Sequence, residues 1–263
     1  MKDDKPVGVV IGKHWPHPHL NYHPGSDVGW ISLLLVSKEF QGQGVGTALL
    51  KKAETALGDL GTKTIHLGRD VQHFFPGIPS EYEAVKQWFE KRGYQKGDTP
   101  FDMIQSVYEL PAHNTDPSLE IRRGRYGEEE GIVQFLSEVF PGRWEYEARS
   151  RFVRGVSAED YIVINEGGLI EGFCKINRPT DIVIGSNVYW SGLFHDKTVG
   201  GIGPLGISRE VRKNGLGLAL VRKAMEELQK DGVDQILIDW TTLDEFYGKL
   251  GFTRWKHYTH MSK

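Results

Sequence analysis

The same loop occurs twice in this chain, at positions 171 residues apart. The first copy runs from Val36 to Gly46 and the second from Ile207 to Gly217, and each lies between a strand-like apolar run and a helix-like one. Glycines let the backbone come close to a ligand, and the N–H groups at a helix start, with the positive end of the helix dipole, attract an anion. The repeat therefore predicts two phosphate-binding loops in two domains of similar fold.

The similarity continues beyond the loops. Residues 34–67 align with residues 205–238 without a gap, and apolar side chains recur every fourth position along each predicted helix, as on a buried helix face. The match resumes where residues 88–94 align with residues 246–252, and both segments predict a short helix, a glycine cap and a strand. The first copy holds 13 more residues between these stretches, around His73–Pro79, which we expect to form a loop.

Length and composition limit the possible classes of protein. The 263 residues suit two domains, which we place at 1–112 and 118–263, with a turn-rich linker at 111–118. A net charge of −3 argues against a basic surface for nucleic acid, and the single cysteine, Cys174, excludes an internal disulfide. With no apolar run of about 18 residues and no signal-like start, we expect a cytoplasmic protein that binds no membrane. The sequence leaves the oligomeric state open.

The order of elements in the second half predicts a mixed α/β fold. A strand and two helices precede an antiparallel meander, and a strand–helix–strand unit with a final strand follows, so that helices cover both faces of a largely antiparallel sheet. The first half begins at a middle strand, within 5–15, and lacks the opening strand and helices. In the second half we expect strands at 119–123, 161–165, 172–177, 188–193, 203–207 and 253–260, and helices at 128–140 and 144–153.

These motifs resemble the GNAT superfamily of N-acetyltransferases in its tandem, two-domain form. The resemblance rests on [Gln/Arg]-x-x-Gly-x-Gly between strand and helix, twice, and on the aromatic-Tyr-x-x-x-Gly-Phe segment at 246–252, and it covers nearly the whole chain. It implies that a central strand of each sheet splays from its neighbour to receive the pantetheine arm of acetyl-CoA, the co-substrate, and that the loop binds the pyrophosphate through backbone N–H groups. The resemblance assigns these roles to Leu205, Ile207, Arg212, Lys213, Asn214, Gly215, Leu216 and Gly217 in the second domain and to Leu34, Val36, Gln41, Gly42, Gln43, Gly44, Val45 and Gly46 in the first.

The resemblance also implies a tyrosine that acts as a general acid, and Tyr247 holds its position. An amine that attacks a thioester expels a thiolate, which a positioned hydroxyl can protonate. Tyrosine stays protonated at neutral pH because its ordinary pKa is about 10. The counterpart in the first domain is Phe89, which has no proton to donate. We therefore expect catalysis in the second domain and at most cofactor binding or weak activity in the first.

Several other residues suit chemistry but also have plain structural explanations. Asp239, Asp244 and Glu245 are candidates to take the proton of the amine, although acids at a strand end or a helix start commonly serve solvation and capping. The histidines within 14–23 are of metal-ligand type, but the prolines around them favour a hairpin loop, and we expect no metal site. The basic residues Lys51, Lys52, Arg222 and Lys223 either meet a CoA phosphate or lie on a solvated helix face, and the aromatic residues Trp190, Trp240, Phe74 and Phe75 weakly suggest an apolar or ring-bearing acceptor.

The sequence thus predicts an acetyl-CoA-dependent N-acetyltransferase that acts on a small-molecule or peptide amine. A non-catalytic protein that binds or senses acyl-CoA is the alternative, and a protein-interaction scaffold is a third possibility. Turnover on a panel of amines distinguishes the enzyme from the sensor, and failure to bind a CoA thioester would favour the scaffold. The identity of the acceptor does not follow from the sequence.

Overall fold

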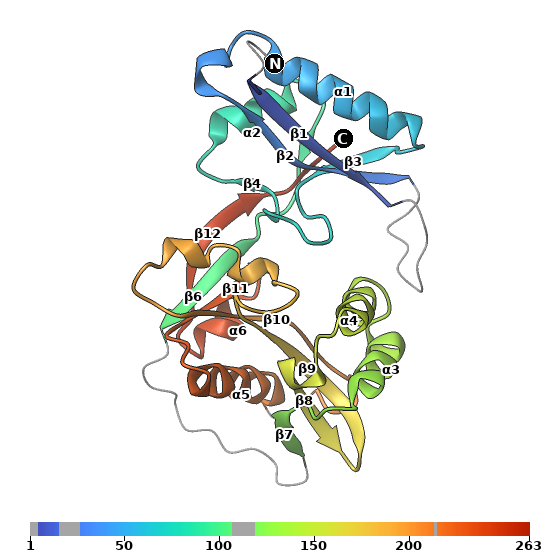
Figure 1. Ribbon diagram of the computed structural model, residues 1–263, viewed down its shortest axis with the longest axis vertical. Coiled ribbons are helices and arrows are strands. Elements are labelled where there is room, and N and C mark those ends of the chain that lie inside the picture. Colours follow the sequence, from blue (N-terminus) through green and yellow to red (C-terminus); the bar gives the residue numbers. More distant parts are fainter. Residues whose placement is uncertain (1–4, 16–26, 107–118, 213–214) are drawn as a thin grey trace. The chain divides into compact units, whose positions relative to one another are not determined.

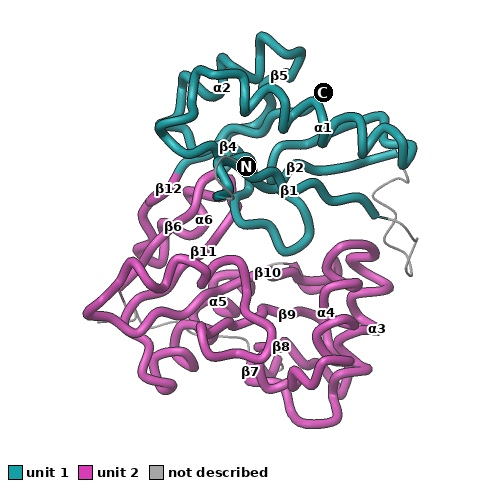
Figure 2. Tube along the Cα trace, turned by 45° about the horizontal axis from the view of Figure 1, so that its top comes forward, with its two compact units in different colours: residues 1–19, 23–100, 257–263 teal, residues 20–22, 101–256 magenta. Residues whose placement is uncertain are grey.

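The computed structural model describes residues 5–15, 27–106, 119–212 and 215–263. The expected linker, the histidines at 17, 19 and 23, and the loop residues Lys213 and Asn214 lie outside these residues. The chain forms two compact units (Figure 2): the first contains residues 1–19, 23–100 and 257–263, and the second contains residues 20–22 and 101–256. These units differ from the contiguous halves 1–112 and 118–263, because each contains a strand from the other half.

The second unit is built on a mixed sheet with the strand order β12, β6, β11, β10, β9, β8, β7. Strands β10 and β11 pair in parallel, whereas the pairs β11–β6, β10–β9, β9–β8 and β8–β7 are antiparallel. The elements are β6 (Phe101–Ser106), β7 (Glu120–Arg123), α3 (Glu129–Val139), α4 (Arg143–Val153), η2 (Ala158–Asp160), β8 (Tyr161–Glu166), β9 (Leu169–Asn177), β10 (Val199–Ile207), α5 (Leu216–Lys230), β11 (Gln235–Thr241), α6 (Asp244–Gly248) and β12 (Thr253–Thr259). The last three residues of β12, 257–259, belong to the first unit.

Helices cover both faces of this sheet (Figure 1). Alternate residues of β9 point to opposite faces: Cys174 and Ile176 pack with α5, whereas Phe173 packs with α3 and α4. The apolar stripe predicted along α5 is confirmed, because all four of its residues are buried: Leu216, Leu220, Ala224 and Leu228. The expected mixed α/β fold with helices on both faces is therefore confirmed for this unit.

The segment 188–193, which we expected to be a strand, was wrongly predicted. It begins at the last residue of one short 3-10 helix, η3 (Ser186–Val188), passes through a turn at 189–190 and ends with a second one, η4 (Ser191–Leu193). Serine, asparagine and glycine follow one another here, and these residues favour turns over strands. The side chain of Asn187 is buried against β10 at Gly201, where an added Cβ would lie 2.2 Å from the amide oxygen. Val188, the buried apolar residue of this segment, packs with Val199 and Leu237 and anchors a turn instead of a strand.

The first unit has a smaller sheet with the strand order β1, β2, β3, β13, β5. Its core lies between the sheet and α1, where Leu50, Ala53 and Leu57 are buried, together with Leu67 and Met261. The expected loop around His73–Pro79 contains a two-residue strand, β4. The elements are β1 (Gly8–His14), β2 (Val28–Val36), η1 (Lys38–Phe40), α1 (Val45–Asp59), β3 (Thr64–Leu67), β4 (Ile78–Pro79), α2 (Glu83–Glu90), β5 (Gln95–Lys96) and β13 (Met261–Ser262).

The two halves of the sequence exchange one strand each. Strand β13, from the second half, lies between β3 and β5 of the first unit, and β6, from the first half, lies between β11 and β12 of the second. These places correspond in the repeat, because β3 aligns with β11 and the segment before β5 aligns with the segment before β12. Each half therefore completes the sheet of the other.

His260, which precedes β13, makes the first unit sensitive to acid. Burial and the nearby guanidinium of Arg69 lower the pKa of His260 from 6.5 to about 4 and outweigh the opposing effect of Asp98. The unfolded chain consequently binds more protons than the folded chain between these values, so stability falls as the pH falls through this window. We expect a loss of about 2 kcal/mol of unfolding free energy between about pH 7 and about pH 4 from this residue.

Urea unfolding of wild type and His260→Gln at several pH values measures this effect. Glutamine does not titrate, so the variant should lose less stability on acidification than wild type. His66, whose pKa is lowered by burial and by Arg69, remains in both proteins, so its own titration is present in both profiles. If the unfolding free energies of the two proteins fall equally as the pH is lowered, His260 is not the source of the acid sensitivity.

Candidate functional site

In each unit one strand loses a neighbour halfway along its length. Strands β10 and β11 pair in parallel only from Val199–Gln235 to Gly201–Leu237, after which β10 continues to Ile207 beside β9 alone. In the first unit, β2 and β3 pair only as far as Ile31–Leu67, although β2 continues to Val36. The splay expected from the sequence is thus present in both units, and it leaves one side of each strand open.

The main chain of β10 presents hydrogen-bonding groups to this open side. The N–H of Ser208 donates to the Glu171 oxygen on β9 at 2.8 Å. Because the direction of these groups alternates along a strand, those of Leu205 and Ile207 face away from β9. The first unit repeats the arrangement, since the N–H of Ser37 donates to Val7 and the groups of Leu34 and Val36 face away from β1.

A side-chain hydrogen bond links the first residue of each loop to the strand before it. Nη2 of Arg212 donates to the oxygen of Ile207 at 3.0 Å, and Nε2 of Gln41 donates to the oxygen of Val36 at 3.0 Å. The four residues occupy matching positions of the repeat. Arginine and glutamine share this place because each carries a side-chain N–H that reaches the last carbonyl of the strand. The bond holds the loop against the open strand.

We expect Arg212→Met to raise the Kd of acetyl-CoA about fivefold, because a hydrogen bond of about 1 kcal/mol that positions the loop is lost. Arg212→Gln is the matched control and should keep wild-type affinity, since Gln41 makes the same bond. Calorimetric titration with acetyl-CoA measures both. Equal weakening by methionine and glutamine would show that positive charge, rather than the bond to Ile207, sets the affinity.

Both loops end in a helix start that suits an anion. Gly44 and Gly215 cap α1 and α5 with φ values of 85° and 77°, a left-handed conformation that favours glycine. The first N–H groups of a helix have no partner within it, so they remain available to a ligand. The side chain of Leu216 is buried in the core, which leaves only its main chain for this purpose.

The next glycine of each loop lies under an aromatic ring. A Cβ on Gly217 would come within 3.1 Å of the Phe246 ring, and one on Gly46 would lie 3.7 Å from the Trp88 ring. The short helix that carries each ring thereby packs closely on the helix start. This contact places the residue that follows the ring, Tyr247 in the second unit, beside the splay.

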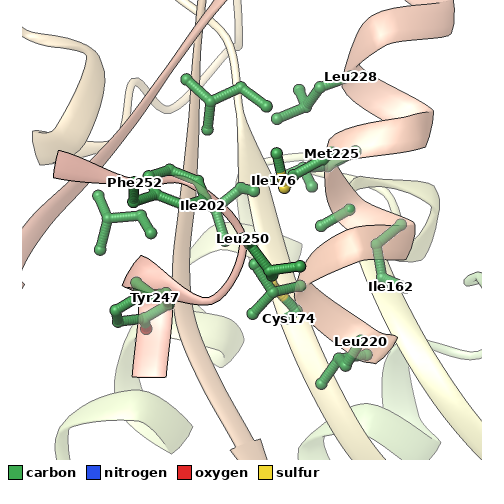
Figure 3. Packing of buried hydrophobic residues seen from close by; sticks show 14 of the residues in the cluster. Ile162, Cys174, Ile176, Ile202, Leu220, Met225, Leu228, Tyr247, Leu250 and Phe252 are labelled. Carbon is green, nitrogen blue, oxygen red and sulfur yellow. The ribbon is translucent and has the colours of Figure 1, made fainter. Parts of the chain in front are cut away.

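Tyr247 lies on α6 at one edge of the apolar cluster under the sheet, with its side chain 5% exposed (Figure 3). Its ring packs edge-on against Phe246, with centroids 4.9 Å apart. Burial, reinforced by nearby Cys174 and Asp239, raises the pKa of Tyr247 above its ordinary value. Phe89 makes the same edge-on contact with Trp88, also at 4.9 Å. The two positions are therefore alike in packing and differ by one hydroxyl.

The three carboxylates considered as bases have different surroundings. Asp244 pairs with Arg254 at 2.7 Å, and Glu245 is exposed at the start of α6. Asp239 is partly buried on β11, two residues beyond the last parallel pair, and accepts a hydrogen bond from the Ser186 hydroxyl. Of the three, Asp239 is the one whose charge affects Tyr247.

Other groups that gather at the start of this splay were missed in the sequence. Nδ2 of Asn177 donates to the oxygen of Gly203 at 3.0 Å, where β10 begins to leave β11, and Asp102 on β6 accepts the N–H of Trp240 at 3.0 Å. Both side chains are almost fully buried. A polar residue inside an apolar run, such as Asp102 in Phe-Asp-Met-Ile, is the signal that would have pointed to them.

The remaining candidates are spread apart. Arg222 and Lys223 form ion pairs along α5 with Glu226 and Glu227, both at 3.0 Å, whereas Lys51 and Lys52 are exposed on α1. Phe74 and Phe75 belong to the first unit, and Trp190 and Trp240 belong to the second. In the described part of the chain, no cluster of three or more metal-ligating side chains occurs, and no helix there has the length and apolar character needed to cross a membrane.

Comparison with known proteins identifies the family. The chain matches the model of the acetyltransferase (GNAT) family over residues 1–75 and 129–252. The chain belongs to the GNAT acetyltransferase family. Each splayed strand, followed by a glycine loop and a helix, thus marks one of the two units of a tandem GNAT protein. Membership of the family supports acyltransferase activity of the N-acetyltransferase type.

Solved structures share this tandem GNAT fold. One is described as a GCN5-related glucosamine N-acetyltransferase region of a fungal multi-domain GH3 β-N-acetylglucosaminidase; it is 25% identical, with a TM-score of 0.84 over 100% of this chain, which spans only about a third (32%) of that one. A GCN5-related N-acetyltransferase from Sphaerobacter thermophilus is 19% identical, with a TM-score of 0.67 over 90% of this chain and 72% of its own. A tandem GNAT protein from the clavulanic acid biosynthesis pathway is 14% identical, with a TM-score of 0.63 over 90% of this chain and 75% of its own. No curated protein sequence matches this GNAT protein.

Proposed function

We propose that this GNAT protein transfers the acetyl group of acetyl-CoA to the primary amine of an amino sugar, and that the second unit carries out the reaction. The observation that carries the proposal is that Tyr247 and Asp239 lie beside the splay of that unit, next to the start of α5. The likeness to a protein described as a glucosamine N-acetyltransferase, which extends over the whole of this chain, supports the class of acceptor.

The residues of the second unit suit the two ends of acetyl-CoA. The main-chain groups of Leu205 and the N–H of Ile207, whose oxygen accepts from Arg212, would bind the pantetheine arm along the open side of β10. The N–H groups at the start of α5, from Gly215 to Gly217, would bind the pyrophosphate, because the positive end of the helix dipole faces it. Arg212 would hold this loop in place through its bond to Ile207. The arm then ends where β10 and β11 separate.

The same unit supplies a group for each proton that moves. The amine nitrogen forms a bond to the acetyl carbon, and the bond from that carbon to sulfur breaks. Asp239, on the face covered by α3 and α4, would take the proton that the amine loses, directly or through water. Tyr247, which comes from α6 on the other face, would give its proton to the departing sulfur and regain one from solvent. Because the two groups approach from opposite faces, neither occupies the place of the other.

The first unit is proposed to bind a CoA thioester without catalysing transfer. Its loop has a left-handed glycine, as the second unit does. Its bond from Gln41 to Val36 matches the bond from Arg212 to Ile207. Phe89 replaces the tyrosine, so no hydroxyl is available at that place to protonate a thiolate. We therefore assign the chemistry to one unit of the two.

Incubation with acetyl-CoA and D-glucosamine tests the proposal. Release of free CoA thiol, with N-acetylglucosamine identified by mass spectrometry, is the expected result. N-acetylglucosamine is the matched control acceptor, because its amine is already blocked and it should release no thiol. If acetyl-CoA binds but no amine in a wider panel is acetylated, the protein is the non-catalytic acyl-CoA binder instead.

A further inference from the structure

Strand β11 contains one extra residue where it passes β6. Ile238 pairs with Met103 and Thr241 pairs with Phe101, so Asp239 and Trp240 together face the single residue Asp102. This is a β-bulge, a feature that turns side chains out of their regular alternation and often lies next to active sites. The bulge falls within the splayed part of β11, two residues beyond its last pair with β10.

Trp240 adopts a backbone conformation that a bulky residue normally avoids. Its φ is 46°, in the left-handed region, which is a rare outlier for an aromatic side chain. Such strain persists only where the surroundings hold it, and it is concentrated at ligand-binding and active sites. Here the N–H of Trp240 donates to the carboxylate of Asp102 at 3.0 Å, and Asp102 is 3% exposed. A hydrogen bond to a buried side chain therefore fixes the strained residue.

The bulge changes the face on which the indole lies. Simple alternation would put Trp240 beside Ile238, in the core under α5. Instead the guanidinium of Arg143, at the start of α4, lies 4.9 Å from the centre of the Trp240 ring. Helix α4 covers the opposite face of the sheet, the one to which Asp239 and Ser186 belong. The partly exposed indole thus stands beside the proposed base rather than in the core.

We propose that Trp240 is the platform on which the ring of an amino-sugar acceptor stacks, and that Asp102 is the positioning residue that holds it there. The inference rests on the proposed function and adds to it the residues that select the acceptor. A sugar ring has an apolar face that packs on an aromatic plane and hydroxyls that need polar partners. The bulge offers both, because the indole lies next to Asp239 on β11, and Asp239 accepts a hydrogen bond from Ser186 of η3.

Trp240→Ala should raise the KM for D-glucosamine about tenfold, since a stacked ring contributes about that factor. The kcat/KM for aminopropanediol, an amine with hydroxyls but no ring, should change less than about twofold, and so should the KM for acetyl-CoA. Trp240→Phe should recover most of the affinity for glucosamine. Equal losses for the ring-bearing and ring-free amines would overturn the platform, as would an unchanged KM for glucosamine.

Two further comparisons separate binding from folding. Trp240→Gly should have a higher Tm than Trp240→Ala, because glycine tolerates the left-handed conformation, yet both should have the same raised KM. Asp102→Ala should raise the KM for glucosamine as Trp240→Ala does, and Asp102→Asn, which keeps an acceptor oxygen for the Trp240 N–H, should restore it. If Asp102→Ala lowers kcat and Tm without changing this KM, Asp102 is structural and the assignment fails.

Calorimetry with D-glucosamine on the CoA-loaded protein keeps this inference distinct from the proposed function. Wild type that binds glucosamine about tenfold more tightly than Trp240→Ala, without acetylating it, would refute the transfer and uphold the platform. Wild type that acetylates other amines but does not bind glucosamine would uphold acetyl transfer in general and refute both the amino-sugar acceptor and the platform.

Discussion

Tyr247→Phe is expected to lower kcat by about a hundredfold or more, since a positioned general acid typically contributes at least that factor. The Kd of acetyl-CoA should stay within about twofold, because the ring that packs on Phe246 is retained. Burial raises the pKa of Tyr247, so wild type should show no loss of kcat from this residue up to about pH 10. Stopped-time assays of CoA release and calorimetric titration give the two numbers.

The first unit supplies the control for this experiment. Phe89 occupies the matching place with the same edge-on contact to Trp88, so a phenylalanine fits the packing without rearrangement. The melting temperature of Tyr247→Phe should therefore equal that of wild type within about 2 °C. A variant with wild-type kcat would show that the thiolate leaves unassisted or is protonated by water, and the role of Tyr247 would be withdrawn.

Removal of residues 257–263 is expected to unfold the first unit. These residues include β13, which pairs with β3 and β5, and the buried side chains of Tyr258 and Met261. Loss of two large buried side chains costs about 2–5 kcal/mol each, which together is comparable to the whole stability of a small domain. Scanning calorimetry should show the loss of one unfolding transition, with the transition of the second unit retained.

Point variants calibrate the effect of the deletion. Met261 is 1% exposed, and Met261→Ala should lower the unfolding free energy by about 2–4 kcal/mol. Its neighbour Ser262 is partly exposed, so Ser262→Ala should change that free energy by less than about 0.5 kcal/mol. A deleted protein that unfolds like wild type would mean that β13 adds nothing to the first sheet.

Local sequence patterns predicted the elements around the two loops because those elements depend on neighbours in the chain. The stripe along α5 follows from residues within one repeat, and the splayed strands were expected from the family resemblance that the repeated motifs carry. The exchange of β6 and β13 does not follow in this way, because the two strands occupy corresponding places in the two sheets. Only long-range pairing decides between them, and no pattern within a strand records it.

The site was predictable where it uses the main chain and was not where it uses tertiary contacts. The cofactor residues were assigned through the family resemblance, which rests on the glycine motifs, and their roles stay predictions. The bulge at Trp240 could not be predicted in this way, because its left-handed residue is not a glycine. A hydrogen bond to Asp102, 138 positions earlier in the chain, stabilises that conformation instead. The turn at 186–193 was taken for a strand because Val188 and its aromatic neighbours have the composition of one. In both cases a buried polar side chain overrides local propensity.

The strand exchange also sets an order of events during synthesis. Proteins made on the ribosome usually fold from the first domain onward. Here the first unit, although translated early, lacks the strand between β3 and β5 until residues 257–263 emerge, after nearly all of the second half. Strand β6 is already available when the second unit is made. The half that is translated first is therefore the half that is completed last.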